Sequence, residues 1–348
     1  MSELNKIVII DNTPIGNGFK PYIIAEMSAN HANDINTAIE IIREAKKCGA
    51  NAVKIQTYTA DTLTLNSKTD AFKAKGAWEG VYLYDLYEDA SMPWEWTPKL
   101  IEVAKEVGIT LFSSPFDYSS VEFLEKLDMP AYKIASPEII DLPLIRRIAQ
   151  TKKPIIMSTG SATLTQITEA VEVLLKEGVK DLILLKCTSE YPANPKDIHL
   201  KTIKHLQELF QCPVGLSDHT LGSAIPIGSV AMGANIIEKH FLVSTEKKTA
   251  DSFFSAVPDE LKAIVDGSQV VFEAIGEVYY PSLTQPAQRS LIVTQDIPKG
   301  EQFKEGVNIR SLRPGGGLEP KLLPLVEGRI AKRDLIYGTL LQWNMVGA

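Results

Sequence analysis

Residues 22–57, YIIAEMSANHANDINTAIEIIREAKKCGANAVKIQT, decide the fold class. The segment begins and ends with the short apolar runs YIIAE and AVKIQT, which have the length and composition of strands covered on both faces. Between them, INTAIEIIREAKKCGA has apolar side chains at helical spacing. The segment therefore predicts a strand, an amphipathic helix and a second, parallel strand.

The same alternation of apolar runs and helical stretches continues as far as residue 277. After the first two runs come TLFSSP, AYKIAS, PIIMST, LILLKC, PVGLSD and IIEKHF, which makes eight strands in all. Eight strand-and-helix units in ~250 residues have the size of a TIM (β/α)8 barrel, so the predicted class is α/β. A doubly wound open sheet is the alternative. One long insertion, residues 58–96, is rich in Tyr and Trp and could cover the barrel mouth.

The character of the sequence changes near residue 281. Residues 281–290 contain two prolines and predict a linker, whereas residues 291–348 have short apolar runs and turn sequences such as DIPKGE and RPGGGLEP. The predicted organisation is a catalytic barrel over residues 1–280, a linker over 281–290 and a small β-rich domain over 291–348. So small a domain has little core, and we expect it to dock on the barrel or on a second subunit.

Composition and charge limit the classes of partner that the protein is expected to bind. The net charge of the 348 residues is −7 and no basic run occurs, so neither nucleic acid nor an anionic membrane surface is an expected partner. No apolar segment approaches the ~20 residues of a membrane helix, and the N-terminus lacks the basic region of a signal peptide. Three widely spaced cysteines suit buried thiols in a reducing compartment, which predicts a cytoplasmic protein.

Two lysines, Lys54 and Lys133, lie within predicted buried strands, near the strand ends where barrel enzymes place their chemistry. A buried lysine is costly unless it is paired or binds an anion. The lysines therefore predict a pocket for a phosphate or a carboxylate, with hydroxyls from Ser114, Ser136 and Ser158. In the alternative, each lysine pairs with an interior carboxylate, Glu26 or Glu238.

Two histidines, His219 and His240, follow the last two predicted strands. Adjacent strands lie ~4.8 Å apart, so two imidazoles at their ends can share one divalent cation at ~2.1 Å each. With only two protein ligands, water and substrate would complete the coordination, as in a Lewis acid that polarises a carbonyl. The alternative for either histidine is a hydrogen-bonded core residue.

The motifs AEMSANH, VKIQTYTADTLT, FSSPFD, YKIAS, STG, CTSEYP, GLSDH, EKHF and RPGGGL, in this order, resemble the sialic acid synthase family over essentially the whole chain. The C-terminal module resembles the antifreeze-like (SAF) domain of that family. The variants SANH, IQTYTADTLTLNS and LYDLYEDA are most similar to its pseudaminic acid branch.

The resemblance implies an enzyme that condenses phosphoenolpyruvate (PEP) with the open-chain aldehyde of an acetamido sugar, giving a nine-carbon 2-keto acid and phosphate. It implies a divalent metal held by His219 and His240, with Mn²⁺ preferred and Mg²⁺ or Co²⁺ as alternatives, and a catalytic Glu26 beside the reacting carbons. The implied PEP-binding residues are Lys54, Ser114, Lys133, Ser136, Ser158, Ser189 and Ser217. The implied sugar-binding residues are Gln56, Tyr191, Asp251 and Arg313.

Arg313 corresponds to an arginine that, in related enzymes, reaches the sugar from the partner subunit, so the resemblance also implies a domain-swapped homodimer. Ser189 departs from the Asn that is usual in the family motif, and Pro137 replaces a frequent Gly. Synthases of N-acetylneuraminate or legionaminic acid are alternatives with the same chemistry. A metal-dependent aldolase that uses free pyruvate is another alternative, but it would need no phosphate pocket. A non-catalytic sugar-binding or ice-binding protein is a third, but it would not need the charged residues inside the barrel.

Overall fold

The computed structural model describes residues 3–280 and 288–348, and the chain divides into two compact units, Met1–Gly276 and Glu277–Ala348. Residues 281–287, most of the predicted linker, lie outside the described residues. None of the helices in the described ranges combines the length and apolar character that crossing a membrane requires.

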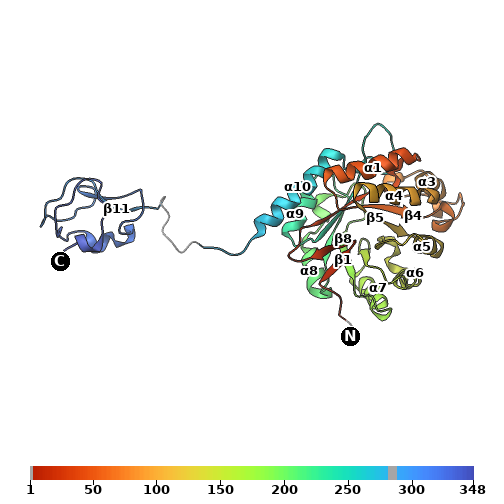
Figure 1. The fold of residues 1–348 in the computed structure, drawn as a ribbon, viewed down its shortest axis with the longest axis horizontal. Coiled ribbons are helices and arrows are strands. Elements are labelled where there is room, and N and C mark those ends of the chain that lie inside the picture. The colour runs from red at the N-terminus through yellow and green to blue at the C-terminus, as the bar shows by residue number, and fades with distance from the viewer. Residues whose placement is uncertain (1–2, 281–287) are drawn as a thin grey trace. The chain divides into compact units, whose positions relative to one another are not determined.

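The first unit is a closed barrel of eight parallel strands, which confirms the predicted fold class (Figure 1). The last strand pairs with the first through the register Ile236↔Tyr22 to His240↔Glu26, so the open-sheet alternative is wrong. All eight strands fall within the apolar runs of the sequence. They are β3 (Tyr22–Glu26), β4 (Ala52–Thr57), β5 (Thr110–Pro115), β6 (Tyr132–Ile134), β7 (Ile155–Ser158), β8 (Leu182–Cys187), β9 (Val214–Asp218) and β10 (Ile236–His240).

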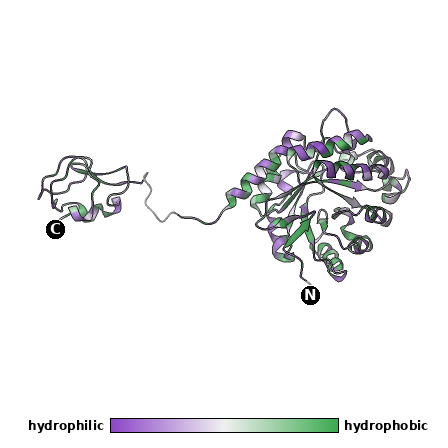
Figure 2. Cartoon of the chain, in the orientation of Figure 1, coloured by the Kyte–Doolittle hydropathy of each residue, from purple (hydrophilic) through white to green (hydrophobic). Residues whose placement is uncertain are grey.

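Helices follow the strands and cover the barrel. Local chemistry sets their ends: Asp34 accepts a hydrogen bond from the backbone N–H of Asn36 at the start of the first helix, and Gly49 ends it at φ 92°. Figure 2 shows hydrophobic and hydrophilic residues alternating along these helices, as an amphipathic layer requires. The main helices of the layer are α1 (Ile35–Cys48), α4 (Thr97–Val107), α5 (Tyr118–Glu125), α6 (Leu142–Ala149), α7 (Leu164–Lys176), α8 (Lys201–Phe210), α9 (Ala224–Ala231) and α10 (Pro258–Ile275).

An N-terminal hairpin closes the barrel at the end where its strands begin. Strands β1 (Ile7–Ile10) and β2 (Thr13–Gly16) pair antiparallel. Their buried side chains Val8, Ile10 and Ile15 share one apolar cluster with residues that open the barrel strands, among them Tyr22, Ala52 and Ile236. Since this end is filled with apolar side chains, polar chemistry has room only at the opposite end, where the strands finish.

The insertion over residues 58–96 contains two short helices, α2 (Ala60–Leu63) and α3 (Leu83–Ala90). The second unit pairs β11 (Ser290–Val293) with β12 (Ile309–Leu312) and carries the short α11 (Leu323–Val326). This unit has an apolar core of its own, which includes Leu291, Phe303 and Leu341.

Candidate active site

The polar residues at the ends of the first, second and last barrel strands lie at the same height along the barrel axis. Glu26 is in register with His240 on one side and with Lys54 on the other. On the neighbouring pair, Glu238 is in register with Ser217. The barrel geometry therefore brings together residues that are more than 200 positions apart in the sequence.

A buried chain of alternating charges crosses the barrel interior. Lys54 Nζ lies 2.9 Å from Glu26 Oε2 and 3.2 Å from Glu238 Oε1. Lys133 Nζ lies 3.6 Å from the same Glu238 oxygen, beyond ordinary hydrogen-bond distance. The pairing of lysines with interior carboxylates, one of the two interpretations of the sequence, is therefore present, but it neutralises the two lysines unequally.

The two lysines differ in their pKa. Burial opposes the charge of Lys54, but Glu238 and Glu26 outweigh it and raise the pKa of this ammonium. For Lys133, burial outweighs the attraction of Glu238 and lowers the pKa to about 8. Of these two lysines, Lys133 is the cation whose charge the protein compensates less, and a bound anion would stabilise it.

Buried hydroxyls lie on both sides of Lys133. Ser114 is on β5 and Ser158 is on β7, the strands that flank the strand of Lys133. Both Oγ atoms are buried, and neither has a hydrogen-bond partner among the described residues. Because buried hydroxyls are nearly always paired, these two indicate a ligand with acceptor oxygens next to Lys133.

Gly160 shapes the adjoining wall. Its backbone N–H donates to Ser136 Oγ at 3.0 Å. A Cβ at this position would lie 2.7 Å from Ser136 Oγ and would also collide with Ser189 Oγ, so any other residue would displace these two hydroxyls. Ser136 and Ser189 are thereby brought to one small recess. Ser217, the remaining predicted PEP contact, donates to Glu238 Oε1 at 3.1 Å.

The two histidines lie side by side with ring centroids 5.3 Å apart. His219 Nδ1 is 2.8 Å from the carbonyl oxygen of Thr188, an acceptor, so Nδ1 carries the hydrogen and Nε2 keeps its lone pair. His240 Nδ1 lies 3.5 Å from Asp251 Oδ2. Thr188 therefore holds His219 in the way that is usual for histidine ligands of a metal, whereas His240 Nδ1 has the Asp251 carboxylate nearby but no hydrogen-bond partner among the described residues.

These histidines fit a divalent cation, since their rings lie 5.3 Å apart at the ends of adjacent strands and an acceptor orients His219. Among the described residues, no cluster of three or more His, Cys, Asp or Glu side chains is placed to hold a metal. Water and substrate would have to supply the remaining ligands, as the sequence predicts.

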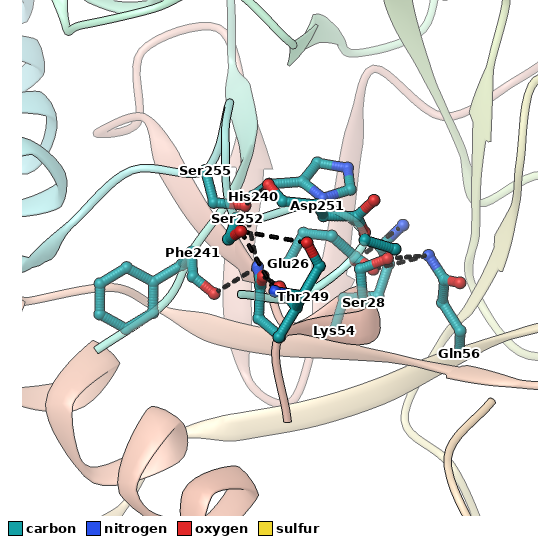
Figure 3. Close-up of polar contacts among 12 residues, drawn as sticks. Glu26, Ser28, Lys54, Gln56, His240, Phe241, Thr249, Asp251, Ser252 and Ser255 are labelled. Carbon is teal, nitrogen blue, oxygen red and sulfur yellow. Dashed lines mark hydrogen bonds and ion pairs between the residues drawn. The ribbon is translucent and has the colours of Figure 1, made fainter. Parts of the chain in front are cut away.

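The predicted sugar-binding residues of the barrel contact Glu26 or the two histidines. Gln56 Nε2 donates to Glu26 Oε1 at 2.9 Å and to Ser28 Oγ at 3.0 Å (Figure 3). Burial would raise the pKa of Asp251, but hydrogen bonds and charge from His240, and a hydrogen bond from Ser28, lower it. The Tyr191 ring packs on His219 with centroids 4.4 Å apart.

Asn30 holds the loop that carries Asp251. Its Nδ2 donates to the Phe241 carbonyl at 3.1 Å and to Ser255 Oγ at 2.8 Å, and its Oδ1 accepts from Thr249 Oγ1 at 2.6 Å. Figure 3 shows these three partners beside His240 and Asp251. The sequence analysis assigns Asn30 no role, although a buried asparagine in SANH could have pointed to one.

Sequence reasoning also missed Glu138 and Cys187. Burial raises the pKa of Glu138 to about 7, and its Oε2 is buried without a hydrogen-bond partner in the described ranges. Burial would raise the pKa of Cys187, but His219 lowers it to about 7. Arg313 is the one predicted site residue outside the barrel unit, and it is exposed on the second unit.

The comparisons with known proteins agree with this geometry. Residues 41–280 match the model of the NeuB family, and residues 288–347 match that of the SAF domain. Pseudaminic acid synthase of Campylobacter jejuni is 45% identical over 93% of this chain and 96% of that protein. Pseudaminic acid synthase of Helicobacter pylori is 43% identical over 92% of this chain and 96% of that protein.

A crystal structure of N-acetylneuraminic acid synthetase from Leptospira borgpetersenii, in complex with citrate, superposes with a TM-score of 0.73 at 30% identity, covering 81% of this chain and 94% of that one. The family model spans well over half of the chain, and the two sequence relatives align over nearly their whole length. The family resemblance inferred from the sequence is therefore confirmed: the chain belongs to the NeuB family and carries an SAF domain at its C-terminal end.

Proposed function

We propose that this protein is a pseudaminic acid synthase, which condenses phosphoenolpyruvate with 2,4-diacetamido-2,4,6-trideoxy-L-altrose and water to give the nine-carbon 2-keto sugar acid and phosphate. The observation that carries the proposal is the barrel mouth itself. There a buried lysine whose charge is only partly compensated, with two unpaired hydroxyls, lies at the same end of the barrel as two neighbouring histidines. The identity to two pseudaminic acid synthases supports the choice of sugar.

Lys133 is the central residue of the part of the site that would bind PEP. Its ammonium would pair with the phosphate, and the hydroxyls of Ser114 and Ser158 would donate to phosphate oxygens. Ser136 and Ser189, in the recess over Gly160, would complete the PEP-binding part of the site, with Ser217 near the carboxylate of PEP. Lys54 lies between two carboxylates, so its role would be to hold Glu26 and Glu238 in place as well as to add positive charge.

A divalent cation, Mn²⁺ in the first instance with Mg²⁺ or Co²⁺ as substitutes, would be held by His219 and His240 and would polarise the sugar aldehyde. A hydrogen bond to Thr188 orients the His219 ring, and the Asp251 carboxylate lies 3.5 Å from His240 Nδ1. Gln56, Tyr191 and Asp251 would contact the sugar, because they surround the same mouth.

In the reaction, C3 of PEP bonds to the aldehyde carbon and the aldehyde oxygen takes up a proton. Water adds to C2 of PEP, and phosphate leaves with cleavage of the carbon–oxygen bond. Glu26 would lie beside these carbons, where its carboxylate can stabilise positive charge at C2 or orient the water. Its hydrogen bond from Gln56 and its ion pair with Lys54 fix the carboxylate for that role.

We also propose that the enzyme is a cytoplasmic, domain-swapped homodimer in which Arg313 of one subunit reaches the sugar in the partner's barrel. Arg313 is exposed on the SAF-domain unit and follows β12, so its guanidinium is available for such a contact.

The test is to incubate the protein with PEP, Mn²⁺ and each candidate sugar while following phosphate release and product mass. We expect phosphate and a nine-carbon acid from the trideoxy-altrose. Turnover only with N-acetylmannosamine or with the legionaminic acid precursor would establish the corresponding synthase instead. Turnover of free pyruvate would establish an aldolase, and no release with any acetamido sugar would refute the synthase chemistry.

A further inference from the structure

Trp78, in the insertion over residues 58–96, contacts loops at the barrel mouth. The indole Nε1 donates to the carbonyl of Ala250 at 2.9 Å, in the loop that follows β10. The indole ring lies 5.2 Å from the ring of Tyr191, which follows β8, and 6.3 Å from the ring of Phe253. Trp78 therefore joins the insertion to the two loops that border the histidines.

These aromatic rings form a continuous surface that leads away from the candidate metal position. Tyr191 packs on His219 at 4.4 Å, and Phe254 packs on His240 at 4.7 Å and on Tyr191 at 5.0 Å. Trp78 and Phe253 continue the surface outward from Tyr191 and Phe254. We call Trp78, Tyr191, Phe253 and Phe254 the aromatic wall.

Exposure increases along the wall. Phe254 is buried at 1% exposure, Tyr191 and Trp78 are partly buried, and Phe253 is 47% exposed. The outer end thus presents large apolar side chains that the protein itself does not cover. The indole N–H, the polar group of Trp78, is already bonded to Ala250 and offers no hydrogen to a ligand.

We propose that the aromatic wall sets sugar specificity by binding the deoxygenated C6 end of the substrate. The inference rests on the proposed function, since that function places the C1 aldehyde beside His219 and His240. C6 is the opposite end of the six-carbon chain, so it lies toward the outer wall formed by Trp78 and Phe253. A methyl group there gains apolar contact with the wall, whereas a hydroxyl gains none and finds no donor in the indole, whose N–H is already bonded.

The test compares kcat/KM for 2,4-diacetamido-2,4,6-trideoxy-L-altrose and for its 6-hydroxy analogue. An apolar pocket rejects an analogue that adds one hydroxyl by up to about 100-fold, so we expect the wild-type protein to prefer the deoxy sugar by about 10-fold or more. Trp78→Ala and Phe253→Ala should each reduce that preference to about 3-fold or less. Most of the change should be loss of activity on the deoxy sugar, with KM for PEP unchanged.

Trp94→Ala is the matched control. Trp94 is at the end of the same insertion, but its ring packs on Phe123 and its Nε1 donates to the Tyr58 carbonyl. This variant should keep the wild-type preference even if its melting temperature falls. If Trp78→Ala fails to fold, Phe253→Ala alone tests the role of the aromatic wall, because a side chain that is 47% exposed is not needed for the core.

Two failures are distinguishable. If the wild-type protein turns over the deoxy sugar but Trp78→Ala and Phe253→Ala lose activity equally on both sugars, the wall has no part in specificity and the proposed function stands. If the wild-type protein releases phosphate with neither sugar, the proposed function fails and the assignment of the wall fails with it.

Discussion

At the scale of single residues, the two buried lysines differ in how far neighbouring carboxylates compensate their positive charge. Lys54 has two carboxylates within 3.2 Å, whereas Lys133 has one carboxylate oxygen at 3.6 Å. A fully compensated ammonium adds little to anion binding, because its field is already cancelled. Lys133 is therefore the residue whose protonation should control PEP affinity.

The pKa of about 8 for Lys133 predicts how PEP binding depends on pH. Below pH 8 the ammonium is charged and attracts phosphate; above it the amine is neutral and the attraction is lost. We expect kcat/KM for PEP to fall about tenfold per pH unit above pH 8, a range in which the phosphate, with a second pKa of about 6, no longer changes charge. At saturating PEP, kcat should persist to higher pH, since the bound dianion raises the pKa of Lys133.

Two variants check the origin of that fall. In Lys133→Arg the side chain stays charged, so the decline above pH 8 should disappear even if affinity drops. Glu138→Gln removes a carboxyl whose pKa of about 7 lies close to that of Lys133, and the decline should remain. A flat kcat/KM for PEP from pH 7 to 9.5 in the wild-type protein would contradict the role given to Lys133.

The sequence predicted which residues gather, but not how they pair. Lys54, Lys133, His219 and His240 could be placed together because each is in or just after a predicted barrel strand. Which oxygen each lysine approaches depends on side-chain conformations set by several strands at once. Glu238, for example, approaches Lys54 and Lys133, which lie on strands not adjacent to its own, and strand position alone does not give these contacts.

At the scale of elements, the loop between β10 and α10 supplies residues that surround His240. It holds Asp251 against His240, and Asn30 ties it to the turn after β3 through three hydrogen bonds. The eight strands were predictable from apolar runs, but the path of this loop was not, because it depends on buried amide contacts between segments more than 200 residues apart.

Asn30→Ala should release that loop. Removing a buried amide with three partners leaves the Thr249 hydroxyl and the Phe241 carbonyl without the bonds they make to Asn30, at a cost of about 1 to 3 kcal/mol, while the Ser255 hydroxyl keeps its bond to the Asp251 carbonyl. We expect weaker Mn²⁺ binding in calorimetry and a higher KM for the sugar, with KM for PEP little changed. Asn33→Ala, whose side chain is near the protein surface and bonds the Asp89 carbonyl, is a control that should bind Mn²⁺ normally. Equal effects on PEP and sugar would mean that Asn30 supports the whole mouth and not this loop.

The N-terminal hairpin shows the same limit on prediction. The run KIVII was visible in the sequence, but a four-residue apolar run does not reveal that it pairs with residues 13–16 and fills the closed end of the barrel. Its partners are side chains of several barrel strands, so only the assembled barrel creates the surface that the hairpin covers.

At the scale of the whole molecule, the barrel and the SAF-domain unit each have an apolar core, and Arg313 is the predicted site residue on the smaller one. A barrel that lacks the arginine of its own chain can still be complete if a partner subunit supplies it. The proposed homodimer therefore predicts that two different inactive subunits can restore each other, which an arginine acting within its own chain cannot do.

Co-expression of an Arg313→Ala subunit with a Lys133→Met subunit tests this prediction. Each variant alone should have little activity, because every site lacks either the arginine or the lysine. In a mixed dimer, the barrel with intact Lys133 receives Arg313 from the Lys133→Met chain, so one site in two is complete. With random assembly we expect about a quarter of wild-type activity. Lys133→Met co-expressed with the double variant Lys133→Met, Arg313→Ala is the control and should stay inactive. Activity no higher than that of the separate variants, in a preparation shown by mass to contain mixed dimers, would place Arg313 in the site of its own chain or outside the site altogether.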